Sequence, residues 1–140
     1  LMVAVGIYLF PYMDLPAFDV SGKMVQLITV TLFAGLAAIG FGVLLGTIAD
    51  TQEQSAPFGA TSVVVLAAIG GIWVPVFLMP EFMQTIAKFS PMNWGLNAYY
   101  DIILRNSGIG GIAKELVFLF LFYIATVAIS IFYEKKQNAV

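Results

Sequence analysis

The sequence contains no cysteine and no histidine among its 140 residues. Without thiols it can form no disulfide and perform no thiolate chemistry, and without imidazole it lacks the ligands of ordinary zinc sites and of histidine-ligated haem. Charged residues are also scarce, at 10% of the chain, where a soluble domain carries about 25%. These absences exclude several classes of metal and redox site and argue against a soluble globular domain.

Apolar residues take the place of the missing charge. They make up 61% of the chain, against about 45–50% in soluble domains, and they are gathered in long uncharged runs of the kind that cross a bilayer. The net charge of −2 is too small to indicate a nucleic-acid partner. The composition therefore predicts a membrane protein whose solvent is the lipid bilayer.

Four apolar segments predict an all-α, polytopic helical membrane bundle over residues 1–140. Residues 1–12 resemble the end of a truncated spanning helix and lack the features of a signal peptide, so we expect the C-terminal part of a longer protein. Residues 24–48, 56–74 and 114–133 approach or exceed the roughly 20 apolar residues that a spanning helix needs. The expected fold is thus one helix end followed by three further spans.

The third segment is interrupted by the sequence "GGIWVPVFLMP" at residues 70–80. Pro75 cannot donate a backbone hydrogen bond and crowds the preceding turn, while Gly70 and Gly71 weaken the helix and allow it to bend. Such a break is tolerated at membrane depth only where protein or water covers it. We therefore expect the helix to stop near Trp73, at the headgroup level that tryptophan favours.

Two short helices are predicted between this break and the last span. Residues 81–89 form an amphipathic pattern suited to the membrane interface, and residues 91–105 follow Ser90 as N-cap and Pro91 as first helical residue. These interfacial or re-entrant helices could seal one face of the bundle, or form a lid over a translocation path. The candidate residues of such an external gate and bend are Gly70, Gly71, Pro75, Pro80, Pro91 and Trp94.

Small residues recur every fourth position in the second segment, at Ala34, Ala38, Gly42 and Gly46. They fall near one face of a helix and allow another backbone to approach closely, which is typical of tight helix packing in membranes. The pattern favours a partner helix in the same chain, but a helix of a second subunit fits it as well.

No constellation of catalytic or nucleotide-binding residues is present. "SGKM" at residues 21–24 fails the phosphate-loop pattern, because Ala17 and Met24 stand where glycine and Ser or Thr are required. The carboxylates are scattered singly, so we expect neither an enzyme nor a cofactor in this chain. We expect the polar side chains of the membrane segments to bond to their own helix backbone or to a neighbour rather than to a substrate; they are Gln26, Thr29, Thr31, Thr61, Ser62, Thr126 and Ser130.

Read in order, "TQEQSA" before a span, "GG" and "P" at its break, "MP" and then "SPMNW" resemble the C-terminal half of a permease subunit of ABC-2 type ABC transporters. The resemblance implies six spanning helices, of which this sequence holds the end of the third and the fourth to sixth. It implies that a polar loop with Asp50, Gln52, Glu53 and Gln54 faces the cytoplasm together with the C-terminus. The break and its short helices would then face outward.

The resemblance also implies partners and a mechanism. Such permeases lie in the bacterial cytoplasmic membrane, pair as homo- or heterodimers, and bind separate subunits that hydrolyse ATP. The expected function is export by alternating access, with ATP bound by the partner. Counting cations alone gives the opposite orientation, since four of the six lie on the side that the resemblance places outside: Lys23, Lys88, Arg105 and Lys114.

Two other classes of protein remain open from the residues alone. An ion-driven secondary transporter or channel would need no ATPase, although the absence of a charge in the middle of any span argues against an ion-coupling site here. A membrane scaffold would bind a partner without transporting anything.

Overall fold

The computed structural model describes residues 22–49 and 51–137, and the regular secondary structure of this part of the chain consists of helices, without strands. The expected spanning end at residues 1–12 and the loop residue Asp50 lie outside the described residues. The helices are α2 (Met24–Ile48), α3 (Gln52–Ile69), the 3₁₀ turn η2 (Val76–Leu78), α4 (Glu81–Ala87), α5 (Pro91–Ile103) and α6 (Ile109–Gln137).

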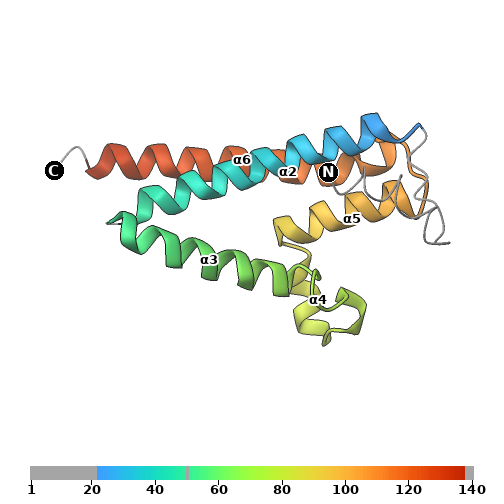
Figure 1. Ribbon diagram of the computed structural model, residues 1–140, viewed down its shortest axis with the longest axis horizontal. Coiled ribbons are helices and arrows are strands. Elements are labelled where there is room, and N and C mark those ends of the chain that lie inside the picture. Colours follow the sequence, from blue (N-terminus) through green and yellow to red (C-terminus); the bar gives the residue numbers. More distant parts are fainter. Residues whose placement is uncertain (1–21, 50, 138–140) are drawn as a thin grey trace, which may run out of the picture.

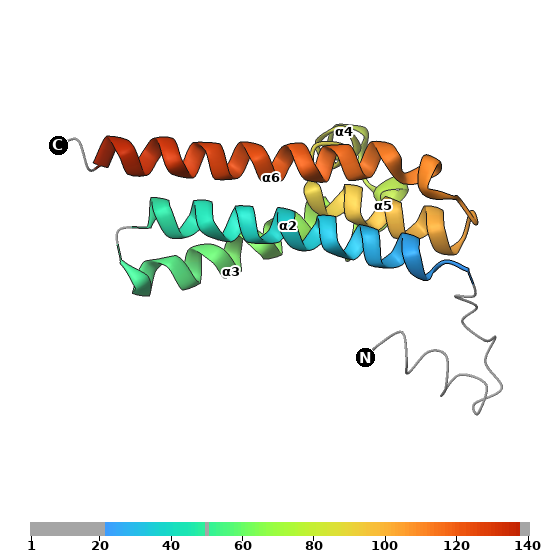
Figure 2. The ribbon, with the colours of Figure 1, turned by 90° about the horizontal axis from the view of Figure 1, so that it is seen from above.

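The two longest helices, α2 and α6, run side by side in the same direction (Figures 1 and 2). Within the described residues they are the two helices that are long and apolar enough to cross a membrane, with mean hydropathies of 2.3 and 2.4. At 1.5 Å per residue, α2 is about 37 Å long, which exceeds a hydrocarbon core of about 30 Å. Both helices match the predicted second and fourth segments.

Helix α3 differs from the predicted span at both ends. It begins at Gln52, because the hydroxyl of Thr51 accepts the N–H of Gln54 at 3.3 Å and Glu53 adds a favourable charge to the first turn. It ends at Ile69 rather than near Trp73. Its polar first turn lowers the hydropathy of the helix, so the expected count of four spans is not confirmed.

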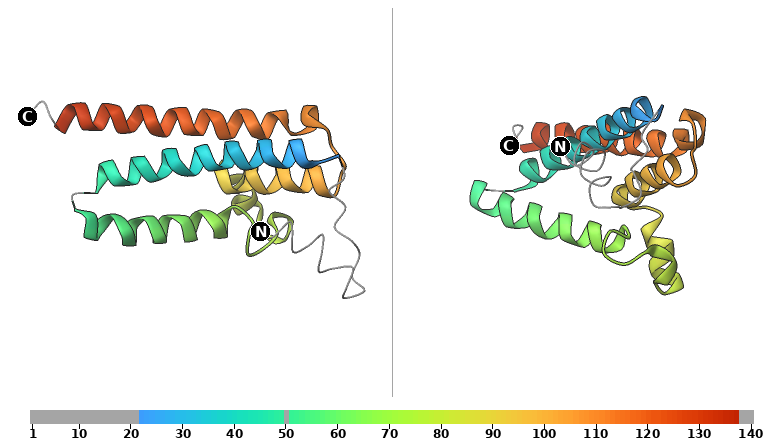
Figure 3. Two further views of the ribbon diagram at one scale, coloured as in Figure 1. Left: turned by 45° about the horizontal axis from the view of Figure 1, so that its top comes forward. Right: turned by 45° about the vertical axis from the view of Figure 1, so that its right-hand side comes forward.

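The two short helices lie close to their expected positions, at Glu81–Ala87 and Pro91–Ile103. Helix α5 is antiparallel to α2 and α6 and lies beside the half of each that contains its N-terminus (Figure 3). Helix α3 lies beside the other half, so α3 and α5 together cover the length of α2. Between them, η2 and α4 form an excursion to the side of the bundle.

The hydrophobic core lies where α2, α5 and α6 meet. Each helix contributes two buried side chains, which are Leu27, Val30, Ala98, Ile102, Ile112 and Leu116. Helix α5 is therefore part of the bundle core, and its interfacial or re-entrant location stays a prediction.

The outer surface is strongly apolar. Large side chains around the break are among the most exposed in the described chain, with exposed fractions of 66% for Trp73, 77% for Phe77, 66% for Phe82 and 75% for Phe89. So many exposed apolar side chains are unfavourable in water and favourable in lipid or against another protein. With the two long apolar helices, it indicates a membrane protein.

Candidate functional site

The break after α3 is a defined helix terminus rather than a loose bend. Gly71 adopts a left-handed conformation with φ of +90°, and the N–H of Ile72 donates to the carbonyl of Ala67 at 3.1 Å. This is the six-to-one hydrogen bond of a Schellman motif, in which glycine is the residue that tolerates the left-handed position. The sequence therefore specifies the end of α3 through Gly71.

Gly70 brings the end of α3 against the start of α5. A Cβ atom at Gly70 would lie 2.6 Å from the Cβ of Met92 and 2.7 Å from the carbonyl oxygen of Leu66. The buried amide of Asn93 donates to the Gly70 carbonyl at 3.2 Å, and the hydroxyl of Ser90 donates to the Leu66 carbonyl at 3.4 Å. Ser90 occupies the N-cap position of α5, but its hydroxyl binds α3 instead of capping its own helix.

The three prolines of the predicted gate each begin a helical element. Pro75 precedes η2, Pro80 precedes α4, and Pro91 is the first residue of α5. Proline suits these positions because its fixed φ is compatible with a helix start and its missing N–H would have no partner there. Along the excursion, the side-chain amide of Gln84 donates to the carbonyl of Met79 at 2.8 Å.

Trp94 joins the excursion to α6. Its indole N–H donates to the carbonyl of Lys88 at 2.7 Å, and its ring lies 5.3 Å from that of Phe118 and 6.3 Å from that of Phe122. The ammonium of Lys114 lies 5.8 Å from the centre of the Phe118 ring. The six candidate gate residues thus lie in one connected region, although a gating role itself stays a prediction.

Among the described glycines of α2, the one in close contact with another helix lies outside the predicted small-residue stripe. That contact is at Gly40, where a Cβ atom would lie 2.5 Å from the hydroxyl of Thr126 and 3.2 Å from the carbonyl of Tyr123 on α6. Gly42 and Gly46 have no such neighbour within 4 Å among the described residues. The pattern missed Gly40 because it lies outside the four-residue spacing.

Three stripe residues instead line an apolar cavity of about 410 Å³ between α2, α3, α5 and α6. Its volume comes from the small side chains of Ala34, Ala38 and Gly42 on α2, facing Gly59 on α3 and Gly95 on α5. Of its lining residues none is charged. Packing of the stripe against a second subunit stays a prediction.

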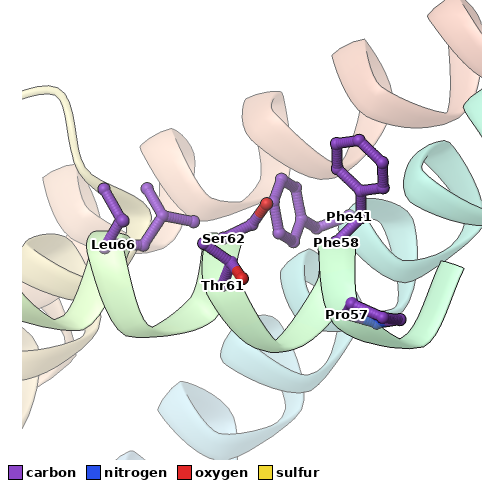
Figure 4. Close-up of a pocket in the computed structure, with 7 residues that line it drawn as sticks. Phe41, Pro57, Phe58, Thr61, Ser62 and Leu66 are labelled. Carbon is purple, nitrogen blue, oxygen red and sulfur yellow. The ribbon is translucent and has the colours of Figure 1, made fainter. Parts of the chain in front are cut away.

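A second, more open apolar groove of about 600 Å³ runs along α3 (Figure 4). Phe41 of α2 and Leu66 of α3 line both hollows. The remaining lining residues all belong to α3: Pro57, Phe58, Thr61, Ser62 and Val65. The sequence signals hydroxyls in an apolar segment, but it does not show that they share a groove.

Helix-backbone bonding by membrane hydroxyls is confirmed at four positions. Thr29, Thr31, Thr126 and Ser130 each donate to a carbonyl four residues earlier, at 2.7–2.9 Å. Thr31 also bonds the hydroxyl of Tyr99 at 2.8 Å, a contact between α2 and α5 that the sequence did not signal. Thr61 and Ser62 have no such partner among the described residues.

The polar residues expected in a loop before the third span lie in the first turn of α3, apart from Asp50. Among the described residues no group of three carboxylates is placed to hold a metal ion. One charged pair is present at the far end of α5, where Arg105 donates to Asp101 at 2.6 Å. The site described by the fold is thus a broken helix beside an uncharged hollow.

Residues 1–104 match the family model described as "ABC-2 type transporter", and the chain belongs to that family. It is 31% identical over 81 residues to the linearmycin resistance permease protein LnrN of Bacillus subtilis, covering 58% of this chain and 21% of that protein. It is 26% identical over 109 residues to the "Putative transport permease YvfS" of the same organism, covering 78% of this chain and 43% of that protein.

The sequence thus spans less than half the length of both curated relatives. No solved structure matches the chain. The family match confirms the resemblance drawn from the order of the "TQEQSA", "GG", "MP" and "SPMNW" motifs.

Proposed function

We propose that this chain forms part of the membrane-spanning permease subunit of an ATP-driven ABC exporter. The observation that carries the proposal is the family match over residues 1–104, which includes α2, α3, the break and α5. The protein would act without enzymatic chemistry of its own and would sit in the bacterial cytoplasmic membrane. ATP would be bound and hydrolysed by a separate partner subunit, and a second permease subunit would complete the pathway.

Export is the direction that we propose. A relative named as a resistance permease supports it, because a transporter that protects a cell from a toxic compound moves that compound outward. We also propose the orientation that the family resemblance implies. The C-terminus and the first turn of α3 face the cytoplasm, and the excursion through η2 and α4 faces outward.

Access would alternate between the two sides through a change in the packing of α3 against the bundle of α2, α5 and α6. Packed helices switch between discrete arrangements rather than deforming smoothly. The hydrogen bonds from Asn93 to the Gly70 carbonyl and from Ser90 to the Leu66 carbonyl attach the end of α3 to α5, so a displacement of α3 would pivot near this end. The excursion that starts at Pro75 would then open or close the outer end of the path.

Purification of the full-length protein in mild detergent from its native host tests the class. We expect a stoichiometric subunit whose ATP hydrolysis depends on the permease. If several gentle conditions yield no such subunit, an ion-driven transporter or a scaffold becomes the better description.

Gly71→Leu and Pro75→Ala test the gate separately. Transport by the full-length protein should fall in both variants, and unchanged transport would remove these residues from the mechanism.

A further inference from the structure

The groove and the cavity adjoin each other in the described chain. Phe41 and Leu66 line both, so these two side chains stand at the boundary between the groove and the cavity. The cavity measures about 410 Å³, and apolar cavities of about 150 Å³ already bind benzene or xenon. The two hollows therefore have room for an elongated molecule.

The walls of the cavity suit hydrocarbon and disfavour charge. Of its lining residues none is charged, and the phenol of Tyr99 is bonded to Thr31 at 2.8 Å. A charged group moved into such surroundings would lose its hydration without gaining a partner. The part of a ligand that enters the cavity is therefore apolar.

The groove differs from the cavity by offering hydrogen bonds. Hydroxyls on α2 and α6 bond to their own backbones, as Thr47 does to Val43 at 2.8 Å, whereas Thr61 and Ser62 have no partner among the described residues and both line the groove. In an apolar environment such groups gain from binding a neutral polar group of a ligand.

We propose that the groove and cavity form one binding site for an uncharged amphiphile that enters sideways from the lipid phase. Its hydroxyl or carbonyl end bonds Thr61 and Ser62, and its hydrocarbon end passes Phe41 and Leu66 into the cavity. In taking this molecule to be the cargo, the inference rests on the proposed function. A resident phospholipid tail is the competing occupant, and the test below separates the two.

The test uses the full-length protein with its ATPase partner in phosphatidylcholine vesicles. The probe is a long-chain alcohol with a photoreactive diazirine in the chain, compared with the corresponding alkane and carboxylate. Mass spectrometry should place the alcohol label on peptides containing Phe41 and Leu66, with weaker labelling by the carboxylate. Thr61→Val combined with Ser62→Ala should reduce labelling by the alcohol about three- to tenfold and leave labelling by the alkane unchanged. The control Thr47→Val should leave labelling by both probes unchanged.

Two glycines of α2 provide a matched pair for the cavity. Gly42 and Gly35 both have open space at the Cβ position within the described chain, but Gly42 lines the cavity and Gly35 lines neither hollow. Gly42→Leu should fill the cavity and reduce labelling by alcohol and alkane at least fivefold, whereas Gly35→Leu should not. Equal labelling of these two variants, or label spread evenly over all lipid-facing peptides, would overturn the site.

Addition of ATP decides between cargo and resident lipid. If the bound molecule is cargo, turnover should lower labelling of the wild-type site relative to a non-hydrolysable ATP analogue. The cargo assignment would be overturned if Gly42→Leu reduces labelling but addition of ATP leaves labelling of the wild-type site unchanged, in a preparation whose ATPase is active. A preparation without any ATPase partner would instead contradict the proposed function, while the alcohol and glycine comparisons would still report on the site.

Discussion

The two sides of the bundle are built differently. Where α2, α5 and α6 meet, side chains such as Val30, Ile102 and Ile112 are fully buried, and Gly40 allows the backbones of α2 and α6 to approach. Beside α3, the same helix α2 lines a cavity and a groove. One helix therefore has a closely packed face and an open face.

In the proposed mechanism, this difference separates a scaffold from a movable part. Close packing resists displacement, because a dense core has no free volume into which side chains can shift. The side-chain hydrogen bonds that attach α3 to α5 lie at the end of α3, where Asn93 donates to Gly70 and Ser90 donates to Leu66. Along the rest of its length α3 borders the groove and the cavity, so the proposed alternating access would have room for α3 to repack against α2.

The largest effect is expected from disturbing the packed face. Gly40→Leu would place a side chain within 2.5 Å of the Thr126 hydroxyl and against the backbone of α6, and overpacking of this kind costs about 3 kcal/mol or more. Thermal unfolding of the full-length protein in detergent should show a large decrease in the midpoint. Gly35→Leu, on the same helix with open space, is the control. Equal midpoints for the two variants would show that α2 and α6 pack less closely than described.

The next largest effect concerns the attachment of α3. Gly70→Ala places a methyl group 2.6 Å from the Cβ of Met92 and 2.7 Å from the Leu66 carbonyl, so the end of α3 must move away from α5, at a cost of about 2 kcal/mol. Hydrogen exchange should increase at the last turn of α3 and the first turn of α5, while the core of α6 stays protected. Uniform loss of protection would mean that both sides unfold as one unit.

The extent of sequence prediction differs between these sides. The long helices follow from apolar runs alone, since α2 and α6 need only length and hydropathy. The break was also readable from Gly71 and Pro75, because these residues restrict the backbone locally. The exact end of α3 was not readable. We expected it near Trp73 because tryptophan favours the membrane interface, whereas the left-handed conformation of Gly71 and the Schellman hydrogen bond end the helix earlier.

Contacts between distant segments were the part that sequence could not supply. A four-residue spacing selected Ala34, Ala38 and Gly42 as packing residues, but spacing gives the face of a helix and not what lies opposite it. The structure places them at a cavity and gives the close contact to Gly40. Likewise the sequence did not single out Asn93, whose hydrogen bond to Gly70 depends on α5 lying against the end of α3.

A smaller effect is expected from removing one hydrogen bond between α3 and α5. Asn93→Leu leaves the buried carbonyl of Gly70 without the donor that now lies 3.2 Å away, which costs about 1–2 kcal/mol. We expect increased exchange at the end of α3 and altered ATPase coupling in the full-length protein. Asn97→Leu is the matched control on α5, because its amide bonds Asn93 and not α3. If both variants behave alike, the effect belongs to the asparagine pair rather than to the link with α3.

The smallest effect is expected at Trp94, which joins the excursion to the packed side. Trp94→Phe retains an aromatic ring beside Phe118 and Phe122 but loses the indole N–H that donates to Lys88, so the stability loss should be about 1 kcal/mol or less. Trp94→Leu removes both interactions and should cost more. If Trp94→Phe is as destabilising as Trp94→Leu, the hydrogen bond to the end of α4 fixes the excursion. If Trp94→Phe is neutral, the packing of the ring on α6 fixes the excursion, which is then anchored to the closely packed side of the bundle.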